Sequence, residues 1–456
     1  MNTTAGKFSG LTKLEIDSYK DFSQIMEKGI WEGLTMLDLY SVKGLSRKEL
    51  EDLLYKNAHI EMNTKSQLKT AKMRLLKRIN RVYTETIKQM EESFLLKIPY
   101  GLIGKKWNSV DEFLDFMEEI AHDKNHGYSK IINCAILKTM SAIEDIIDNP
   151  RVTELDKELE NITEKIKSIK GLKITSQNDS GFSFVYNSPN KTEPIHVRGQ
   201  LVYRAKQFSK ILQKLIYNRK YRSADLMTDL IGFRIEINDD DGAEMCNDMV
   251  SFFAKKIFEG ECVLDDKGLL GKEFLQESGI ELRQVKPKES TSDGFKNASL
   301  GGSVPYKKKH QEHGGFSGVE AQFVKVSNKN ETGFSKHEIY DMKKVLSLVA
   351  RLLGCLTIGN IKVAVREIGL MSGFSEEKIL EHLLFPKESK FYKKGTFNID
   401  EGHHGFLIPL TIGDQVYFTT EDTYSSSLEV LYKDYPKKVT LFNYKEFITK
   451  YDTIKI

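Results

Sequence analysis

The stretch that decides the fold begins at Tyr203-Arg204-Ala205-Lys206 and ends at Asp229-Leu-Ile-Gly-Phe-Arg-Ile-Glu-Ile237. Apolar residues recur at helical spacing in its first half, where cations precede and accompany them, so this half predicts a basic helix from Arg204 to Leu215. Apolar and polar residues alternate from Ile231 to Ile237, which predicts a strand. Asp229 precedes that strand by two residues, so its carboxylate is expected at the N-terminal end of the strand.

This combination of charges suits a triphosphate and its metal ion. Cations neutralise phosphate oxygens, and a carboxylate holds the Mg²⁺ that bridges them. From these residues alone, a solvated basic helix followed by an edge strand is the alternative interpretation.

Three later stretches extend the pattern. The first, Ser292-Asp-Gly-Phe-Lys-Asn-Ala-Ser299, predicts a loop with a glycine, an aromatic residue and a cation. The second, Val319-Glu-Ala-Gln-Phe-Val324, predicts a strand with Glu320 and Gln322 on one face. The third runs from Gly333 to Lys343 and contains His337.

Taken in order, these stretches resemble the synthetase domain of the RelA/SpoT family, the alarmone synthetases and their relatives. That family shows an R-x-K…K helix, a D-I-x-G-x-R-I strand, a G-Y-x-S-x-H loop, an E-x-Q strand and a later H…Y-K helix. The resemblance covers residues 195–345. It implies a nucleotidyltransferase-like mixed β-sheet, which also fits the alternation of helices and strands in this region.

The resemblance implies a role for each matching residue. The phosphates of ATP would be held by cations, Mg²⁺ by two catalytic carboxylates, and a guanine acceptor by the loop and two polar side chains. These residues are, in turn, Arg204, Lys206, Lys214 and Arg234 for ATP; Asp229 and Glu320 for catalysis and Mg²⁺; and Gly294, Phe295, Lys296, Gln322 and His337 for the acceptor.

The departures from the family pattern fall on the acceptor side. Phe295 replaces a tyrosine and keeps the aromatic face, whereas Ser299 stands in place of the family's histidine. The run from Lys286 to Gly318 is polar, glycine-rich and too long for an ordinary connection, so we expect either a lid over the acceptor or a disordered insert.

These observations lead to one functional expectation and two alternatives. We expect a Mg²⁺-dependent pyrophosphokinase that moves the β,γ-diphosphate of ATP onto the 3′-hydroxyl of GDP or GTP, as in synthesis of the alarmone (p)ppGpp in the stringent response. The first alternative is a toxin of the same superfamily that modifies the tRNA 3′ end. The second is a catalytically degenerate nucleotide- or RNA-binding regulatory module.

The chain as a whole predicts an α+β protein in three parts. We expect an N-terminal helical domain over residues 1–150, the synthetase-like domain over 151–345, and a small α+β accessory region over 346–456, with a protein regulator contacting one of the two flanks. In the N-terminal part, a long helix from Thr64 to Leu95 carries seven cations and no acid between Lys65 and Arg81. This helix is either a solvated face of a bundle or a surface that follows an RNA phosphate backbone. His122-Asp123 matches the dipeptide of HD-type hydrolases, but further ligands are lacking and no hydrolase is expected.

Composition limits the class of protein. The 456 residues carry a net charge of only +3, so any basic site must be local. No apolar run is long enough for a membrane helix, and the N-terminus lacks the apolar core of a signal peptide. The four cysteines are scattered without metal-binding spacing. These features predict a reduced, cytoplasmic protein without a membrane partner.

Overall fold

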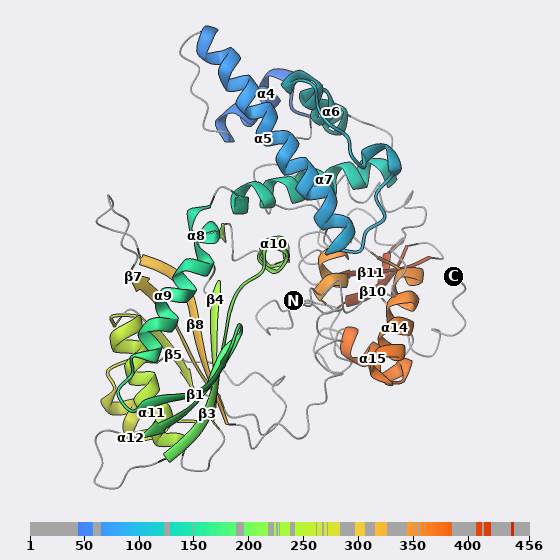
Figure 1. The fold of residues 1–456 in the computed structure, drawn as a ribbon. Coiled ribbons are helices and arrows are strands. Elements are labelled where there is room, and N and C mark those ends of the chain that lie inside the picture. The colour runs from blue at the N-terminus through green and yellow to red at the C-terminus, as the bar shows by residue number, and fades with distance from the viewer. Residues whose placement is uncertain are drawn as a thin grey trace. The chain divides into compact units, whose positions relative to one another are not determined.

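The structure is a computed structural model. It describes residues 44–57, 65–122, 128–147, 149–187, 196–217, 223–224, 227, 229–237, 242–260, 262–266, 269–270, 272–282, 297–305, 315–325, 344–350, 352–353, 356–384, 407–412, 415–420 and 439–441. The described residues form a mixed α+β protein (Figure 1). They divide into two compact units: unit 1 holds Met1–Asp145, Leu212–Arg222 and Phe334–Ile456, and unit 2 holds Ile146–Ile211 and Ser223–Gly333.

Unit 2 is built on a mixed eight-stranded sheet. Its strand order is β1-β2-β3-β4-β8-β7-β5-β6, and neighbouring strands are antiparallel except for the parallel pairs β4–β8 and β5–β6. The strands are β1 (Leu172–Asn178), β2 (Gly181–Asn187), β3 (His196–Ala205), β4 (Ile231–Ile237), β5 (Cys262–Asp266), β6 (Glu281–Leu282), β7 (Asn297–Pro305) and β8 (Gly315–Lys325).

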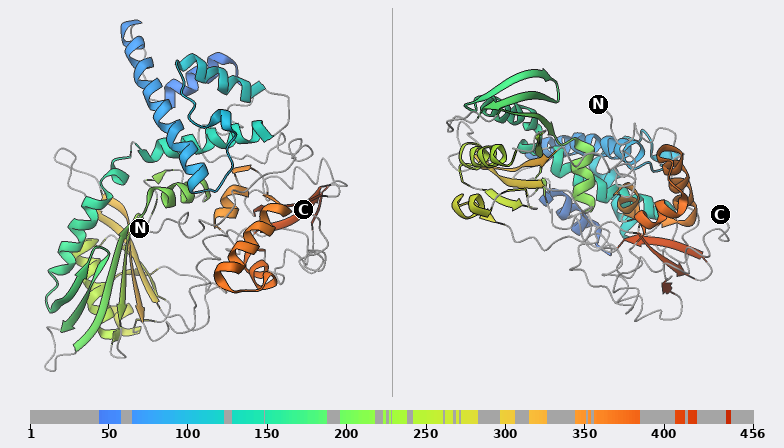
Figure 2. Two further views of the ribbon diagram at one scale, coloured as in Figure 1. Left: turned by 45° about the vertical axis from the view of Figure 1, so that its right-hand side comes forward. Right: turned by 90° about the horizontal axis from the view of Figure 1, so that it is seen from below.

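Helices cover one face of this sheet (Figure 1 and Figure 2). They are α9 (Leu155–Lys167), preceded by α8 (Pro150–Thr153), and α11 (Gly242–Phe252), which continues into the π-helical turn η3 (Phe253–Ile257); α12 (Lys272–Glu277) follows β5. The ring of Phe253 lies 5.9 Å from that of Phe233 on β4 and 5.8 Å from that of Phe323 on β8. All three rings are almost fully buried, and each contributes roughly 2–3 kcal/mol of burial free energy.

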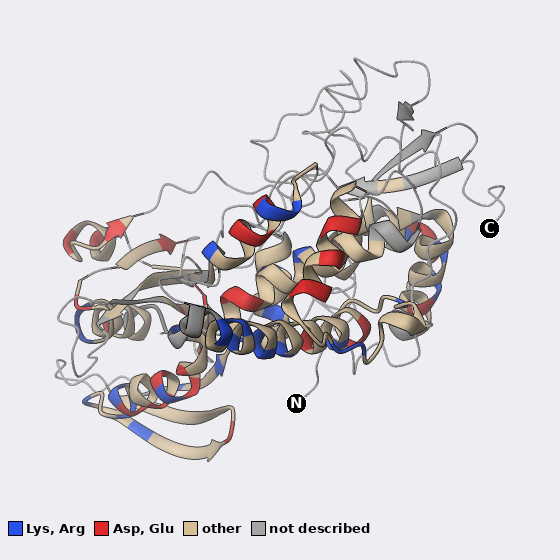
Figure 3. Ribbon diagram, turned by 90° about the horizontal axis from the view of Figure 1, so that it is seen from above, with Lys and Arg blue, Asp and Glu red and all other residues tan. Residues whose placement is uncertain are grey.

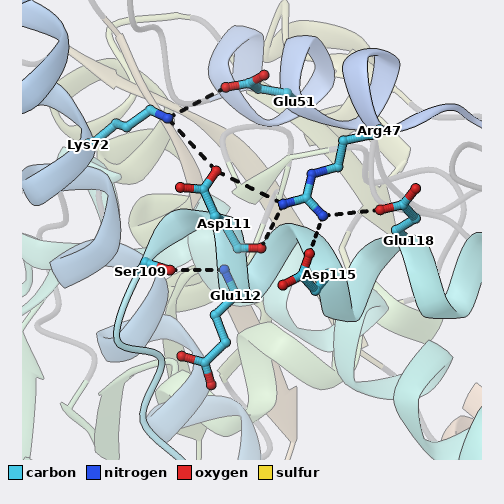
Figure 4. A network of polar contacts seen from close by, with 8 residues as sticks. All are labelled: Arg47, Glu51, Lys72, Ser109, Asp111, Glu112, Asp115 and Glu118. Carbon is cyan, nitrogen blue, oxygen red and sulfur yellow. Dashed lines mark hydrogen bonds and ion pairs between the residues drawn. The ribbon is translucent and has the colours of Figure 1, made fainter.

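The N-terminal helices of unit 1 are α4 (Arg47–Asn57), α5 (Lys65–Glu92), α6 (Val110–His122) and α7 (Tyr128–Ile147), with the 3₁₀ turn η1 (Tyr100–Leu102) between α5 and α6. Ser46 and Glu49 have the spacing that predicts a capping box, and the structure confirms it: Ser46 N donates to Glu49 Oε2 at 2.7 Å and Glu49 N donates to Ser46 Oγ at 3.4 Å. Arg47 then joins α4 to α6 through Asp115 and Glu118 (Figure 4).

The C-terminal part of unit 1 holds a second, antiparallel sheet of order β12-β10-β11-β9. Its elements are β9 (Leu356–Thr357), α14 (Ile358–Ser372), α15 (Glu376–Leu383), β10 (Leu407–Ile412), β11 (Gln415–Thr420) and β12 (Val439–Leu441). The sequence predicts a hairpin over residues 405–420 and a strand over 439–442, and the pairing of β10 with β11 and β12 matches both. The strongly apolar run from Val345 to Gly359 predicts a single helix, and this prediction is wrong at its C-terminal end, because Leu356 and Thr357 pair with β11.

Two expectations for the central region are also wrong. The basic helix does not begin at Arg204: β3 continues to Ala205, and α10 (Phe208–Tyr217) begins three residues later. Backbone pairing of Tyr203 and Arg204 with β4 overrides the helical spacing that follows them. The polar run to Gly318 is not wholly a lid or an insert, since Asn297–Pro305 and Gly315–Lys325 pair as antiparallel strands.

No helix within the described ranges is long and apolar enough to cross a membrane.

Candidate functional site

The two faces of the unit 2 sheet differ in chemistry. On the face beneath α9 and α11, β3, β4 and β8 present buried apolar side chains, among them Leu201, Phe233 and Phe323. Because side chains alternate across a strand, the polar residues of the same strands share the opposite face. The side chains on this polar face include Arg204, Arg234, Glu320, Gln322 and Ser299.

Strand register arranges the polar face in two rows. In the first row, Arg204 lies opposite Gly232, Gly232 opposite Glu320, and Glu320 opposite Gly301. Strands are about 4.8 Å apart, so the backbones of Arg204 and Glu320 are about 10 Å apart with a glycine between them. The Arg204 side chain leans over that glycine, because a Cβ built on Gly232 would lie 3.9 Å from Arg204 Cγ and Nε.

The second row, two residues further along, joins four polar side chains. Arg234 lies opposite Gln322, Gln322 opposite Ser299, and Ser299 opposite Asp265 on β5. Arg234 Nε is 3.1 Å from Glu236 Oε1 on the same strand, and Glu236 is largely buried. The positive charge of Arg234 is therefore partly balanced by a neighbour on the same face.

Glu320 is held by two donors on a single oxygen. Its Oε1 accepts hydrogen bonds from Ser299 Oγ at 2.6 Å and from Gln322 Nε2 at 3.3 Å. Within the described residues, nothing donates to Oε2. The flanking positions Gly232 and Gly301 carry no side chain, and a Cβ on Gly301 would meet no atom within 4 Å. The two hydrogen bonds to Oε1 thus orient the carboxylate, and the space beside it leaves room for a ligand that binds Oε2.

Lys206 and Asp229 form a tight ion pair at the end of the sheet where β4 begins. Lys206 Nζ lies 2.6 Å from Asp229 Oδ2, and their side chains are only 14% and 26% exposed. Lys206 follows the last residue of β3, and its backbone N donates to Leu230 O at 2.7 Å. Loss of either partner would remove this ion pair from a partly buried site, which is a destabilising change.

A bulge in β8 supports the segment that carries Asp229. The β7–β8 register passes from Val319 to Ser317 across one extra residue, Gly318, whose φ is +135°. A Cβ at this position would lie 2.7 Å from Met227 O and 3.3 Å from Leu230 Cβ. Only glycine fits both this backbone conformation and this close approach.

The structure brings together part of the set predicted from sequence. Arg204, Arg234, Glu320 and Gln322 share the polar face, and Lys206 contacts Asp229. Lys214 lies in the part of α10 that belongs to unit 1. Gly294, Phe295, Lys296 and His337 lie outside the described residues.

The two carboxylates predicted to hold Mg²⁺ have different partners. Asp229 pairs with Lys206, and Glu320 accepts from Ser299 and Gln322. Among the described residues there is no group of three or more His, Cys, Asp or Glu side chains that could hold a metal ion.

Sequence reasoning missed three residues of the polar face. Ser299 was read only as a replacement for a histidine, and neither Asp265 nor Gly301 was singled out. The short apolar run Cys262-Val-Leu264 before Asp265 and the alternation of Ala298-Ser-Leu-Gly301 are the signals that could have placed them on strands. Register alone shows that Asp265 and Ser299 are directly opposite each other.

Comparisons of the chain with models of protein families, with curated proteins and with solved structures found no match.

Proposed function

We propose that this protein is a Mg²⁺-dependent pyrophosphokinase with a nucleotidyltransferase-like core, transferring the β,γ-diphosphate of ATP to the 3′-hydroxyl of GDP or GTP. The observation that carries the proposal is Glu320, a carboxylate with both recorded donors on one oxygen and a glycine on each side, in the same row as Arg204. This arrangement fits a site that must hold a polyphosphate beside an acid.

In the proposed reaction, the 3′-oxygen of the acceptor forms a bond to the β-phosphorus of ATP. The bond from that phosphorus to the α–β bridging oxygen breaks, and AMP leaves with the electron pair. The hydroxyl proton passes to Glu320. Arg204 and Arg234 would bind the phosphate oxygens, and Lys206 would do so from the mouth of the sheet.

The residues fit Mg²⁺ in part. Mg²⁺ usually binds through one or two carboxylates together with substrate phosphates, so a cluster of three protein ligands is not required. Glu320 Oε2 accepts no hydrogen bond within the described chain, whereas Asp229 is paired with Lys206. These two residues would hold the ion, which supplies neutralisation of phosphate charge when bound.

The test uses γ-labelled ATP and Mg²⁺ with GDP, GTP and bulk tRNA offered separately, and with Glu320→Gln as the blank. We expect label on GDP or GTP and none with the Gln variant. Asp229→Asn should also abolish transfer, and near-normal turnover by that variant would remove Asp229 from the site. Label on tRNA would make tRNA the acceptor in place of GDP or GTP and leave ATP as the donor.

The ion pair between Lys206 and Asp229 favours one rival function. In this pair Lys206 already neutralises Asp229, the carboxylate proposed to bind the metal. Such a pair is expected in a degenerate, regulatory module that binds a nucleotide without a metal. Calorimetry with a non-hydrolysable ATP analogue separates the two. Binding that strengthens with Mg²⁺ supports the enzyme, and tight binding independent of Mg²⁺ without turnover supports the regulatory module.

A further inference from the structure

Helix α5 carries its charges in an unusual order. From Lys65 to Thr84 it has seven cations and no acid, and its acids, Glu85, Glu91 and Glu92, all come in its last eight residues. The first turn has no acidic residue and the last turn has no basic one.

Two of these cations have a structural role. Lys72 Nζ lies 3.7 Å from Glu51 Oε1 and 3.9 Å from Asp111 Oδ1, so it joins α4 and α6 to α5 (Figure 4). Arg78 Nε lies 2.9 Å from Glu144 Oε1 on α7. Both cations therefore serve packing between helices of unit 1.

Four other cations face solvent along one line, which we call the basic stripe: Arg74, Lys77, Arg81 and Lys88. Each is exposed, and none has an ion pair or hydrogen bond within the described part of the chain. At 100° per residue they fall within an arc of about 60°, and they extend over about 21 Å of helix. The buried stripe of α5, with Leu75, Ile79 and Val82, lies on the opposite side. In Figure 3 the cations of this helix are drawn in blue.

Helix stability does not explain this arrangement. Like charges three, four or seven residues apart repel one another along the stripe. Arg74 and Lys77 have no acid four residues before or after them, and Arg81 has only Glu85. Cations toward the N-terminus and acids at the C-terminus also oppose the helix dipole. The order of charges is therefore mildly unfavourable for the free helix, and an anionic partner would relieve the repulsion.

The surroundings of the stripe indicate which anion. A membrane-binding helix needs large apolar side chains beside its cations. Here the exposed neighbours are Thr70 and Thr84, and the only large exposed apolar side chain on the described part of α5 is Met73. A line of point charges with polar neighbours fits the regularly spaced phosphates of a nucleic acid strand.

We propose that the basic stripe of α5 binds the phosphate backbone of a nucleic acid. No aromatic side chain is exposed beside it on the described helix, so binding rests on charge and does not read sequence. Single-stranded RNA, duplex RNA and DNA share this chemistry, and the experiment compares them.

The experiment measures binding of the full-length protein to labelled single-stranded RNA, duplex RNA and duplex DNA by fluorescence anisotropy at several salt concentrations. ATP is absent, so the result does not depend on the proposed activity. The test variant is Arg74→Gln, Lys77→Gln, Arg81→Gln and Lys88→Gln combined. The matched control removes the same charge at four other exposed lysines: Lys48→Gln, Lys106→Gln, Lys255→Gln and Lys256→Gln.

We expect the stripe variant to bind at least about tenfold more weakly at low salt, with the slope of log K against log salt reduced by about 3, since each phosphate contact contributes about 0.7–0.9. The charge-matched control should stay near wild type. Replacement by the other cation, Arg74→Lys with Arg81→Lys, should preserve binding because a phosphate contact needs only a point charge.

Three results would overturn the proposal. The first is wild-type protein that binds none of the nucleic acids. The second is a control variant that loses as much affinity as the stripe variant. The third is a stripe variant that binds the nucleic acids as tightly as the wild type.

Thermal unfolding provides an independent check. Removal of the stripe relieves repulsion along α5, so the unfolding temperature of the stripe variant should equal or exceed that of the wild type. A clear decrease would mean that these cations stabilise the fold, and the argument for a ligand would fail.

Discussion

At the scale of single residues, the position of one hydroxyl determines how Glu320 is presented. Ser299 Oγ donates to Glu320 Oε1 at 2.6 Å, and Gln322 Nε2 donates to the same oxygen at 3.3 Å. Hydrogen bonds to a charged group contribute about 1.5–3 kcal/mol. Because its hydrogen bond is the shorter one, the serine is the stronger of the two restraints on the carboxylate. Ser299 is thus a positioning residue for the proposed reaction.

Ser299→Ala should lower kcat for diphosphate transfer by about tenfold to a hundredfold, because the carboxylate loses its shorter hydrogen bond. KM for ATP should change little, since the phosphate-binding cations are intact. Initial rates at varied ATP measure both constants. Ser299→Thr keeps a hydroxyl and should recover most of the rate; a threonine variant as slow as the alanine variant would contradict the positioning role.

The phenol of Tyr83 gives unit 1 a dependence on alkaline pH. Tyr83 is 1% exposed, its hydroxyl donates to Leu102 O at 3.0 Å, and burial raises its pKa to about 12. Its pKa in the unfolded chain is about 10, so above pH 10 the unfolded state loses the proton that the folded state keeps. The stability that the buried phenol contributes is therefore complete below pH 10 and decreases as pH rises toward 12.

The expected decrease in the free energy of unfolding is about 2–3 kcal/mol between pH 10 and pH 12. Denaturant unfolding measures it through the fluorescence of Trp107, whose ring is 5.5 Å from that of Tyr83, in a Trp31→Phe background because the chain has a second tryptophan. Tyr83→Phe should lose less stability over the same pH range. An equal loss in both proteins would assign the effect to other groups.

At the scale of elements, the neighbouring strands β8 and β7 each carry a glycine, and the two glycines have different roles. Gly318 of β8 forms a bulge at φ +135°, in contact with the segment that carries Asp229, whereas Gly301 of β7 leaves open space beside Glu320. The first glycine is required by the backbone. The second is required only if a ligand occupies the space.

Gly318→Ala and Gly301→Ala should therefore separate stability from binding. Gly318→Ala should destabilise unit 2 by about 1–3 kcal/mol, because an L side chain is strained at this φ and meets Met227 O. Gly301→Ala should leave stability within about 0.5 kcal/mol of wild type, as expected for a substitution without a clash.

Gly301→Ala should nevertheless weaken binding of a non-hydrolysable ATP analogue, which calorimetry measures. Unchanged affinity in this variant would show that the space beside Glu320 is not used by the nucleotide. A Gly318→Ala protein as stable as wild type would contradict the bulge argument.

At the scale of the whole molecule, each unit has an apolar core of its own. Trp107, Phe113 and Phe116 pack together in unit 1, while Phe253 packs against Phe233 and Phe323 in unit 2. The chain enters unit 2 at Ile146, passes through unit 1 over Leu212–Arg222, and returns to unit 1 at Phe334 for its C-terminal part. The two cores can therefore respond separately to a substitution.

Phe253→Ala should destabilise unit 2 by about 3–5 kcal/mol, because it leaves a cavity among three buried rings. Hydrogen exchange of the β4 and β8 amides should increase, while the unfolding midpoint reported by Trp107 should change much less. A joint shift of both signals by the same amount would show that the units unfold as one cooperative structure.

The sequence by itself determined most of the local structure. Period-two alternation located β4, β8 and the β10–β11 hairpin, helical periodicity located α5, and a capping-box spacing marked the start of α4. These patterns are legible because each element buries one face, which imposes its own repeat on the chain. The order of the motifs along the chain, rather than periodicity, selected Arg204, Arg234, Glu320 and Gln322, whose side chains share the polar face.

Only the tertiary structure decided what the local pattern left ambiguous. Arg204 lies on a strand because β4 pairs with it, although helical spacing begins a few residues later. Asp265 and Ser299 come opposite each other through pairing of strands more than thirty residues apart, and two cations of α5 turn inward only because acids on α4, α6 and α7 meet them. Partners distant in sequence set these features, and no local repeat records them.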